Sequence, residues 1–259
     1  MKIKLLRAFL LLLSLCLLSA CGRDGSIPAV GTPPDSSETA SVSSTVLAKT
    51  EDRGEAYLDG FIFLGESTTY HLKSRGVLKG GTETLQVWGP DNGTINLDTT
   101  VTSIKIRYPD TGEYLSISEA AARKKPRYML LTFGLNGAVR NIRRGKEAYQ
   151  ACYRSLIREI QAASPDTRII LQSCFPVADN MDMSRYTCSL DELNDAIEVI
   201  NGWVRELARE EDLRYLNTAE ILKDENGRLK HSYQNGDGHH LTAEAYREIL
   251  TYIRTHGYQ

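Results

Sequence analysis

The feature that most constrains the fold is an alternation of short apolar runs with longer amphipathic stretches. Residues 61–64 form an uninterrupted apolar run, which is typical of a strand buried on both faces. Similar runs predict further strands at residues 84–88, 128–133, 168–173 and 213–216. Apolar residues spaced three and four apart predict helices over residues 149–160, 190–207 and 246–253. Repeated strand–helix units imply a parallel sheet of about five strands covered on both faces, which is a three-layer α/β/α domain.

A predicted hairpin and three predicted helix caps refine this outline. Residues 95–108 alternate apolar and β-branched side chains out of step with the strand–helix rhythm, which predicts an inserted β-hairpin. Ser116 precedes Glu119 by three residues, and Ser189 precedes Glu192 by three, so each pair predicts a capping box at a helix start. Thr242 is the expected cap of the last helix.

The N-terminus is typical of an export signal. Basic residues precede an apolar stretch over residues 8–20, which is shorter than the roughly 20 residues needed to span a bilayer. The stretch ends Leu18-Ser19-Ala20-Cys21, which resembles a bacterial lipobox. We expect a lipoprotein signal peptide over residues 1–21, with the mature chain anchored outside the cytoplasm through acylated (palmitate-type) Cys21. A plain secretory signal or an uncleaved anchor is the alternative.

The next segment, residues 22–56, is rich in Ser, Thr, Pro and Gly and predicts a flexible stalk. We expect the folded domain over residues 57–259. Loss of the three basic signal residues would shift the formal net charge from −2 to −5, which argues against nucleic acid as a partner. The membrane contact would come from the lipid.

Three cysteines remain after the signal peptide: Cys152, Cys174 and Cys188. Outside the cytoplasm an odd number leaves at least one thiol unpaired within the chain. A Cys174–Cys188 disulfide is one possibility. Their spacing resembles no metal-binding motif.

Polar residues follow the predicted strands where ligands of parallel sheets bind, beyond the carboxyl ends. Ser67 follows the first strand, and Asn136 follows the third. Asp237 and His240 come just before the last helix, in a loop that could reach the same edge. A serine becomes a nucleophile when a histidine takes its proton and a carboxylate orients that histidine. The pattern therefore indicates nucleophilic catalysis by Ser67.

The motifs resemble those of the SGNH (GDSL-type) hydrolase family over roughly residues 59–256. Gly65-Glu66-Ser67, Gly134-Leu135-Asn136 and Asp237-Gly238-His239-His240 occur in the family's order. The resemblance implies a flavodoxin-like fold, Ser67 as nucleophile, His240 as general base and Asp237 as its orienting partner. It also implies an oxyanion hole made by the Ser67 N–H, a glycine N–H and the Asn136 amide. We assign the glycine to Gly93, with Gly89 as the alternative.

Two positions depart from the family's pattern. Glu66 replaces the usual aspartate beside the serine, and Gly137 replaces the aspartate after the asparagine. Neither supplies the nucleophile, base or oxyanion donor, but the longer Glu66 side chain can alter how the serine turn is held.

Other polar residues have ordinary interpretations. His239 is expected at the rim of the site and His71 at the surface, with a position facing the cleft, four residues beyond Ser67, as the alternative. The long segment 175–189 either shapes a substrate site or merely connects two elements. Adjacent histidines in a loop seldom bind one ion, so we expect no metal and no organic cofactor.

The expected function is therefore a surface-tethered serine esterase acting on O-acyl esters, above all O-acetyl esters of carbohydrate. An O-acyltransferase, or an inactive glycan-binding protein on the same scaffold, is the alternative. The sequence indicates no oligomeric state.

Overall fold

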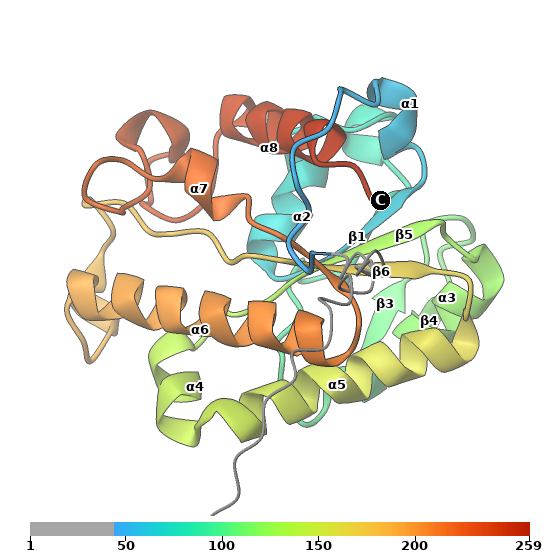
Figure 1. The fold of residues 1–259 in the computed structure, drawn as a ribbon, viewed down its shortest axis with the longest axis horizontal. Helices are drawn as coiled ribbons and strands as arrows, with labels where there is room; N and C mark the ends of the chain where they lie inside the picture. The colour runs from blue at the N-terminus through green and yellow to red at the C-terminus, as the bar shows by residue number, and fades with distance from the viewer. Residues whose placement is uncertain (1–43) are drawn as a thin grey trace, which may run out of the picture. The chain divides into compact units, whose positions relative to one another are not determined.

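A five-stranded parallel sheet forms the centre of the domain. The computed structural model describes residues 44–259, and the signal peptide and most of the expected stalk lie outside them. The strand order is β2-β1-β5-β6-β7, and every neighbouring pair is parallel (Figure 1). The strands are β1 (Phe61–Gly65), β2 (Val87–Trp88), β5 (Tyr128–Thr132), β6 (Arg168–Gln172) and β7 (Arg214–Leu216). The predicted α/β/α class is confirmed.

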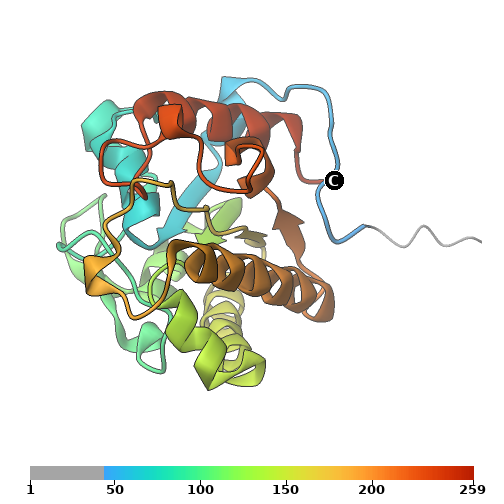
Figure 2. The same ribbon diagram turned by 90° about the vertical axis from the view of Figure 1, so that its left-hand side faces the viewer.

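Helices cover both faces of the sheet (Figures 1 and 2). One face carries α1 (Glu55–Leu58), α2 (Ser67–Ser74), α7 (Ala219–Leu222) and α8 (Ala243–Thr255). The other carries α3 (Ile117–Lys124), α4 (Ala138–Arg144), α5 (Lys146–Ala163) and α6 (Leu190–Glu210). Short 3₁₀ turns occupy residues 81–83, 101–103, 183–185 and 231–233. Within the described residues, no helix combines the length and apolar character that a membrane crossing requires.

The alternation of side chains along β1 and β5 divides the core in two. Ile62, Leu64 and Leu131 pack with α5 and α6, whereas Phe63 and Leu130 point to the opposite face and pack with α8. Every residue of both strands is buried. Burial on both faces explains why these strands read as continuous apolar runs in the sequence.

Some predicted boundaries are wrong. The strand expected at residues 84–88 is only Val87–Trp88, because residues 81–84 form a turn. The inserted hairpin lies later than residues 95–108: β3 (Lys105–Arg107) pairs with β4 (Tyr114–Ser116). Its turn is closed by Gly112, which has a φ of 77° and donates its N–H to the Tyr108 carbonyl. Gly112 was not part of the pattern that predicted the hairpin.

The described part of the expected stalk lies against the domain. Val46 forms a parallel bridge with Tyr215, Leu47 is buried, and the Thr50 N–H donates to the Thr255 carbonyl at 2.6 Å. The bridge to Tyr215 extends the sheet beside β7, and the bond to Thr255 ties the segment to the end of α8. The difference from the flexible stalk expected over residues 22–56 comes from Val46 and Leu47, two apolar residues in a polar segment.

The capping predictions are confirmed. Both Ser116–Glu119 and Ser189–Glu192 form reciprocal capping boxes, and the Thr242 hydroxyl accepts the Ala245 N–H. Cys152, Cys174 and Cys188 are free thiols. Cys174 is buried behind the end of β6, and its thiol donates to the Phe133 carbonyl at 2.8 Å, which accounts for it without a disulfide.

Truncation of one buried side chain in the central strand, β5, should test the core. Leu131 in β5 is fully buried, so Leu131→Ala should lower the free energy of unfolding by about 2–5 kcal/mol in urea denaturation. Val199 on α6 is 45% exposed, and Val199→Ala should change it by at most about 0.5 kcal/mol. Equal losses in both variants would contradict the assignment of β5 to the centre of the core.

Candidate active site

The serine, histidine and aspartate singled out in the sequence form a chain of hydrogen bonds at the carboxyl edge of the sheet. Ser67 is the first residue of α2, directly after β1. Its Oγ lies 2.9 Å from His240 Nε2, and His240 Nδ1 lies 2.7 Å from Asp237 Oδ2. Since a carboxylate only accepts, the proton of the neutral ring resides on Nδ1, and Nε2 is free to accept from Ser67. This is the proton path that activates a serine hydroxyl.

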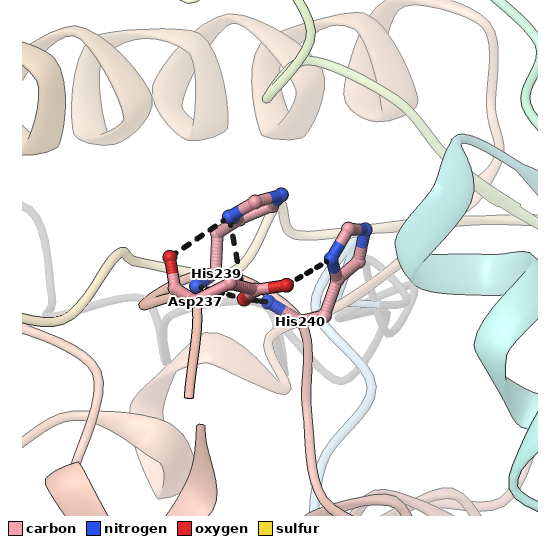
Figure 3. Close-up of side chains that lie close together, drawn as sticks. All are labelled: Asp237, His239 and His240. Carbon is pink, nitrogen blue, oxygen red and sulfur yellow. Dashed lines mark hydrogen bonds and ion pairs between the residues drawn. The ribbon is translucent and has the colours of Figure 1, made fainter. Parts of the chain in front are cut away.

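The loop before α8 holds the Asp237 carboxylate in place. Asp237 Oδ1 accepts the backbone N–H groups of His239 at 3.0 Å and His240 at 2.8 Å, as Figure 3 shows. Partial burial acts to raise the pKa of Asp237, but these donors, with the His240 ring, lower it to about 2. The carboxylate is therefore ionised at neutral pH and orients the His240 ring.

Two other imidazole rings pack against the ring of His240. The His239 ring lies 4.0 Å from it between centroids, and the His71 ring 4.1 Å. The His71 ring stacks on His240, the His239 ring is tilted against it, and Figure 3 shows His239 on the side of His240 away from the neighbouring helix. His71 is thus not the surface residue expected from the sequence. Its Nδ1 is buried without a hydrogen-bond partner among residues 44–259.

The surroundings disfavour protonation of these stacked rings. Burial, followed by the charge of His240, lowers the pKa of His71 to about 4. Burial also lowers the pKa of His240, although its hydrogen bond to Asp237 opposes the shift. His240 is therefore neutral at neutral pH, the form in which it can accept a proton.

Glu66 joins the serine turn to the loop that carries Asn136. Its side chain is buried, and the carboxylate accepts three backbone N–H groups: Gly134 at 3.0 Å, Leu135 at 3.0 Å and Asn136 at 3.1 Å. The longer side chain that departs from the family's pattern therefore holds two site loops together. Burial raises the pKa of Glu66 to about 7, against the opposing effect of the three donors.

The two motif glycines are required by close packing. A Cβ on Gly65 would lie 2.3 Å from the Thr132 carbonyl oxygen. A Cβ on Gly134 would lie 2.5 Å from Cys174 Sγ, and Gly134 has a φ of 137°. Both sites exclude larger residues: Gly65 lets the end of β1 approach the end of β5, and Gly134 lets the loop after β5 pack against Cys174 and Ile200.

The two predicted oxyanion donors besides the Ser67 N–H, Asn136 and Gly93, are both hydrogen-bonded within the protein, in different ways. Asn136 Nδ2 donates to Thr94 Oγ1 at 3.1 Å and to Asn96 Oδ1 at 3.2 Å, which fixes the orientation of its amide. The Gly93 N–H donates to the Pro90 carbonyl at 2.9 Å and closes a turn against Tyr70. Because that backbone N–H closes a turn, we leave Gly93 out of the proposed oxyanion hole. The Asn136 side-chain amide can exchange one of its two present acceptors for a substrate oxygen.

Gly137 fits the conformation of its position. It has a φ of 74° and precedes α4. Glycine adopts this left-handed conformation without the cost that a Cβ imposes. The missing aspartate is therefore compatible with an intact loop.

One group among the described residues could hold a metal ion. Ligand atoms of Asp237, His239 and His240 all lie within 4.8 Å of one another. The Asp237 carboxylate and the His240 ring already form a chain of hydrogen bonds with Ser67. These three residues are called the relay below, and their mutual contacts account for the arrangement. The absence of a metal or organic cofactor stays a prediction.

Fold and site together define an ester hydrolase of the three-layer α/β/α class. The sequence matches the GDSL-like Lipase/Acylhydrolase family over residues 63–248, and the chain belongs to this family of carboxylic ester hydrolases. A search of curated proteins found no match.

Solved structures share the fold at low sequence identity. A protein from Streptococcus pneumonia described as a platelet activating factor has a TM-score of 0.52 and 19% identity, covering 75% of this chain and 82% of that one. A G-D-S-L family lipolytic protein from Desulfitobacterium hafniense DCB-2 has a TM-score of 0.52 and 15% identity, covering 76% of this chain and 98% of that one. An acetyl-xylooligosaccharide esterase from Geobacillus Stearmophilus is more distant, with a TM-score of 0.43 and 17% identity over 83% and 98%.

Replacement of Glu66 by its amide should test the bridge between the loops. In Glu66→Gln an NH₂ group must face a backbone N–H, which leaves buried donors unpaired and should cost about 1–3 kcal/mol of stability. Displacement of Asn136 should lower kcat for p-nitrophenyl acetate more than it raises KM. Glu192→Gln, in the exposed capping box of α6, provides a matched control. A Glu66→Gln variant with wild-type stability and kcat would show that the bridge is dispensable.

Proposed function

We propose that this protein is a serine esterase that hydrolyses O-acyl esters, above all O-acetyl esters of carbohydrate, at the outer side of a bacterial membrane. The observation that carries the catalytic part is the continuous contact from Ser67 Oγ through His240 to Asp237, at 2.9 Å and 2.7 Å. The lipobox ending at Cys21 supports the tether. No metal or organic cofactor is required by this chemistry.

In the acylation step, Ser67 Oγ attacks the acyl carbon while its proton passes to His240 Nε2. The carbonyl electron pair moves onto oxygen, where the Ser67 N–H would donate to the negative charge. The Asn136 amide would join it by giving up its bond to Thr94 or to Asn96. As the first residue of α2, Ser67 has no acceptor within the helix for its N–H. Collapse of the intermediate breaks the ester C–O bond, and the departing alcohol oxygen takes the proton from Nε2.

Deacylation follows the same path. Water attacks the acyl-serine carbon and gives one proton to His240 Nε2, which then returns it to Ser67 Oγ as the carboxylic acid leaves. In an acyltransferase a second alcohol would replace this water.

The intact bridge from Glu66 to the Asn136 loop supports an active enzyme rather than an inert binding scaffold, because the departure from the family's pattern preserves the site's framework.

Removal of the nucleophile should abolish turnover without unfolding the protein. Ser67→Ala should reduce p-nitrophenyl acetate hydrolysis to background, and His240→Ala should do nearly the same, while circular dichroism stays unchanged. His239→Ala should keep most of the rate, because His239 contacts the relay without belonging to it. Loss of turnover in His239→Ala with turnover retained in His240→Ala would overturn the assignment.

The acid limb of the pH–rate profile should report His240. Burial lowers the pKa of this ring below its ordinary value of 6.5. Neutral His240 accepts the serine proton, so kcat/KM should be retained above that pKa and lost as the pH falls through it. In steady-state kinetics, the midpoint of the acid limb of kcat/KM should therefore lie below pH 6.5. A midpoint above this value would contradict the described environment of His240.

A further inference from the structure

A cavity of about 380 Å³ adjoins the relay on the side of Asp237 and His239. Its other wall comes from the long segment after β6 and includes Asn180, Asp182 and Tyr186. The sequence left open whether this segment shapes a substrate site or only connects β6 with α6. The cavity and the contacts below favour the first interpretation.

The segment is packed directly onto the loop that carries the relay. The Ala178 N–H donates to the Gly238 carbonyl at 2.7 Å. A Cβ on Gly238 would lie 2.5 Å from Met181 Cα, so only glycine lets the two backbones come this close. Met181 is 7% exposed and anchors the segment. The wall of the cavity is therefore held in register with Asp237 and His239.

The geometry of proton transfer determines on which side the alcohol leaves. In the proposed mechanism the departing oxygen takes a proton from His240 Nε2, so the alcohol must lie beside His240. His71 covers one face of that ring at 4.1 Å. The His239 ring also lies beside that ring, with centroids 4.0 Å apart, and His239 lines the cavity. The alcohol part of the ester can extend past His239 into this space.

The lining suits a sugar better than a lipid alcohol. It offers a carboxylate, an amide and an imidazole, which can bond to hydroxyl groups, and Tyr186, which is 43% exposed. An exposed aromatic ring presents an apolar face and a polar tip, as a sugar ring also does. Met181 is the one aliphatic side chain among the described lining residues.

Building on the proposed function, we propose that the cavity beside His239 is a carbohydrate subsite that binds the alcohol part of the ester, with Tyr186 and Asp182 as specificity residues. Such a subsite explains how an esterase with a common Ser–His–Asp site would favour acylated glycans. It also gives the segment 175–189 a role in substrate selection.

Two substrates separate this subsite from the relay. Full-length protein is assayed with p-nitrophenyl acetate, whose leaving group carries no sugar hydroxyls, and with O-acetylated xylo-oligosaccharides as a soluble glycan probe. Tyr186→Ala and Asp182→Asn are compared with Asp166→Asn, an exposed change in the turn between α5 and β6. The asparagine keeps an oxygen that can accept the Ser184 N–H, which the Asp182 carboxylate now accepts.

Tyr186→Ala should raise KM for the acetylated oligosaccharide about tenfold and Asp182→Asn about threefold, as expected for the loss of an aromatic or polar contact. Both should keep kcat/KM for p-nitrophenyl acetate within about twofold. Unchanged KM for the glycan, or equal losses with both substrates, would overturn the subsite.

A binding measurement keeps the subsite testable if the proposed esterase activity fails. In that case p-nitrophenyl acetate would show no turnover, and calorimetry with the deacetylated xylo-oligosaccharide becomes the decisive readout. Binding that is lost in Tyr186→Ala but kept in Asp166→Asn would support the subsite. No binding to the wild-type protein would overturn it.

Discussion

The site depends on a buried carboxylate that holds two loops of the sheet edge together. Glu66 accepts the backbone N–H groups of Gly134, Leu135 and Asn136. It thereby connects the turn that presents Ser67 with the loop that presents Asn136. A buried carboxyl group without partners would be costly, and three backbone donors offset that cost while fixing the geometry. Ser67, the proposed nucleophile, and Asn136, the proposed oxyanion donor, are thus held by one group that the proposed mechanism does not use.

A second set of contacts holds the base. Asp237 orients His240 through the ring nitrogen and through the backbone of its own loop, and the rings of His71 and His239 pack against the His240 ring. His71 comes from α2, the helix that begins at Ser67, so nucleophile and base are tied to the same short element. Preorganisation of this kind reduces the motion needed to reach the reactive geometry.

The sequence predicted the sheet, its helices and the polar residues at its edge, because apolar periodicity and capping signals are local. It did not predict the role of Glu66, whose three partners lie almost seventy residues away. Nor could it predict that His71 stacks on His240, since that contact depends on how α2 meets the loop before α8. The assignment of Gly93 has a similar limit: a glycine near a strand end can also serve a turn, as the hydrogen bond from its N–H to the Pro90 carbonyl indicates.

The most direct test of the central claim is covalent labelling of the full-length protein with a fluorophosphonate, followed by peptide mapping. An activated serine attacks phosphorus, whereas an ordinary hydroxyl does not. The account predicts one adduct, on Ser67, that is lost when the probe meets the Ser67→Ala protein. Well-folded wild-type protein that carries no adduct on Ser67, or an adduct on another serine, would contradict the claim that Ser67, His240 and Asp237 form a working relay.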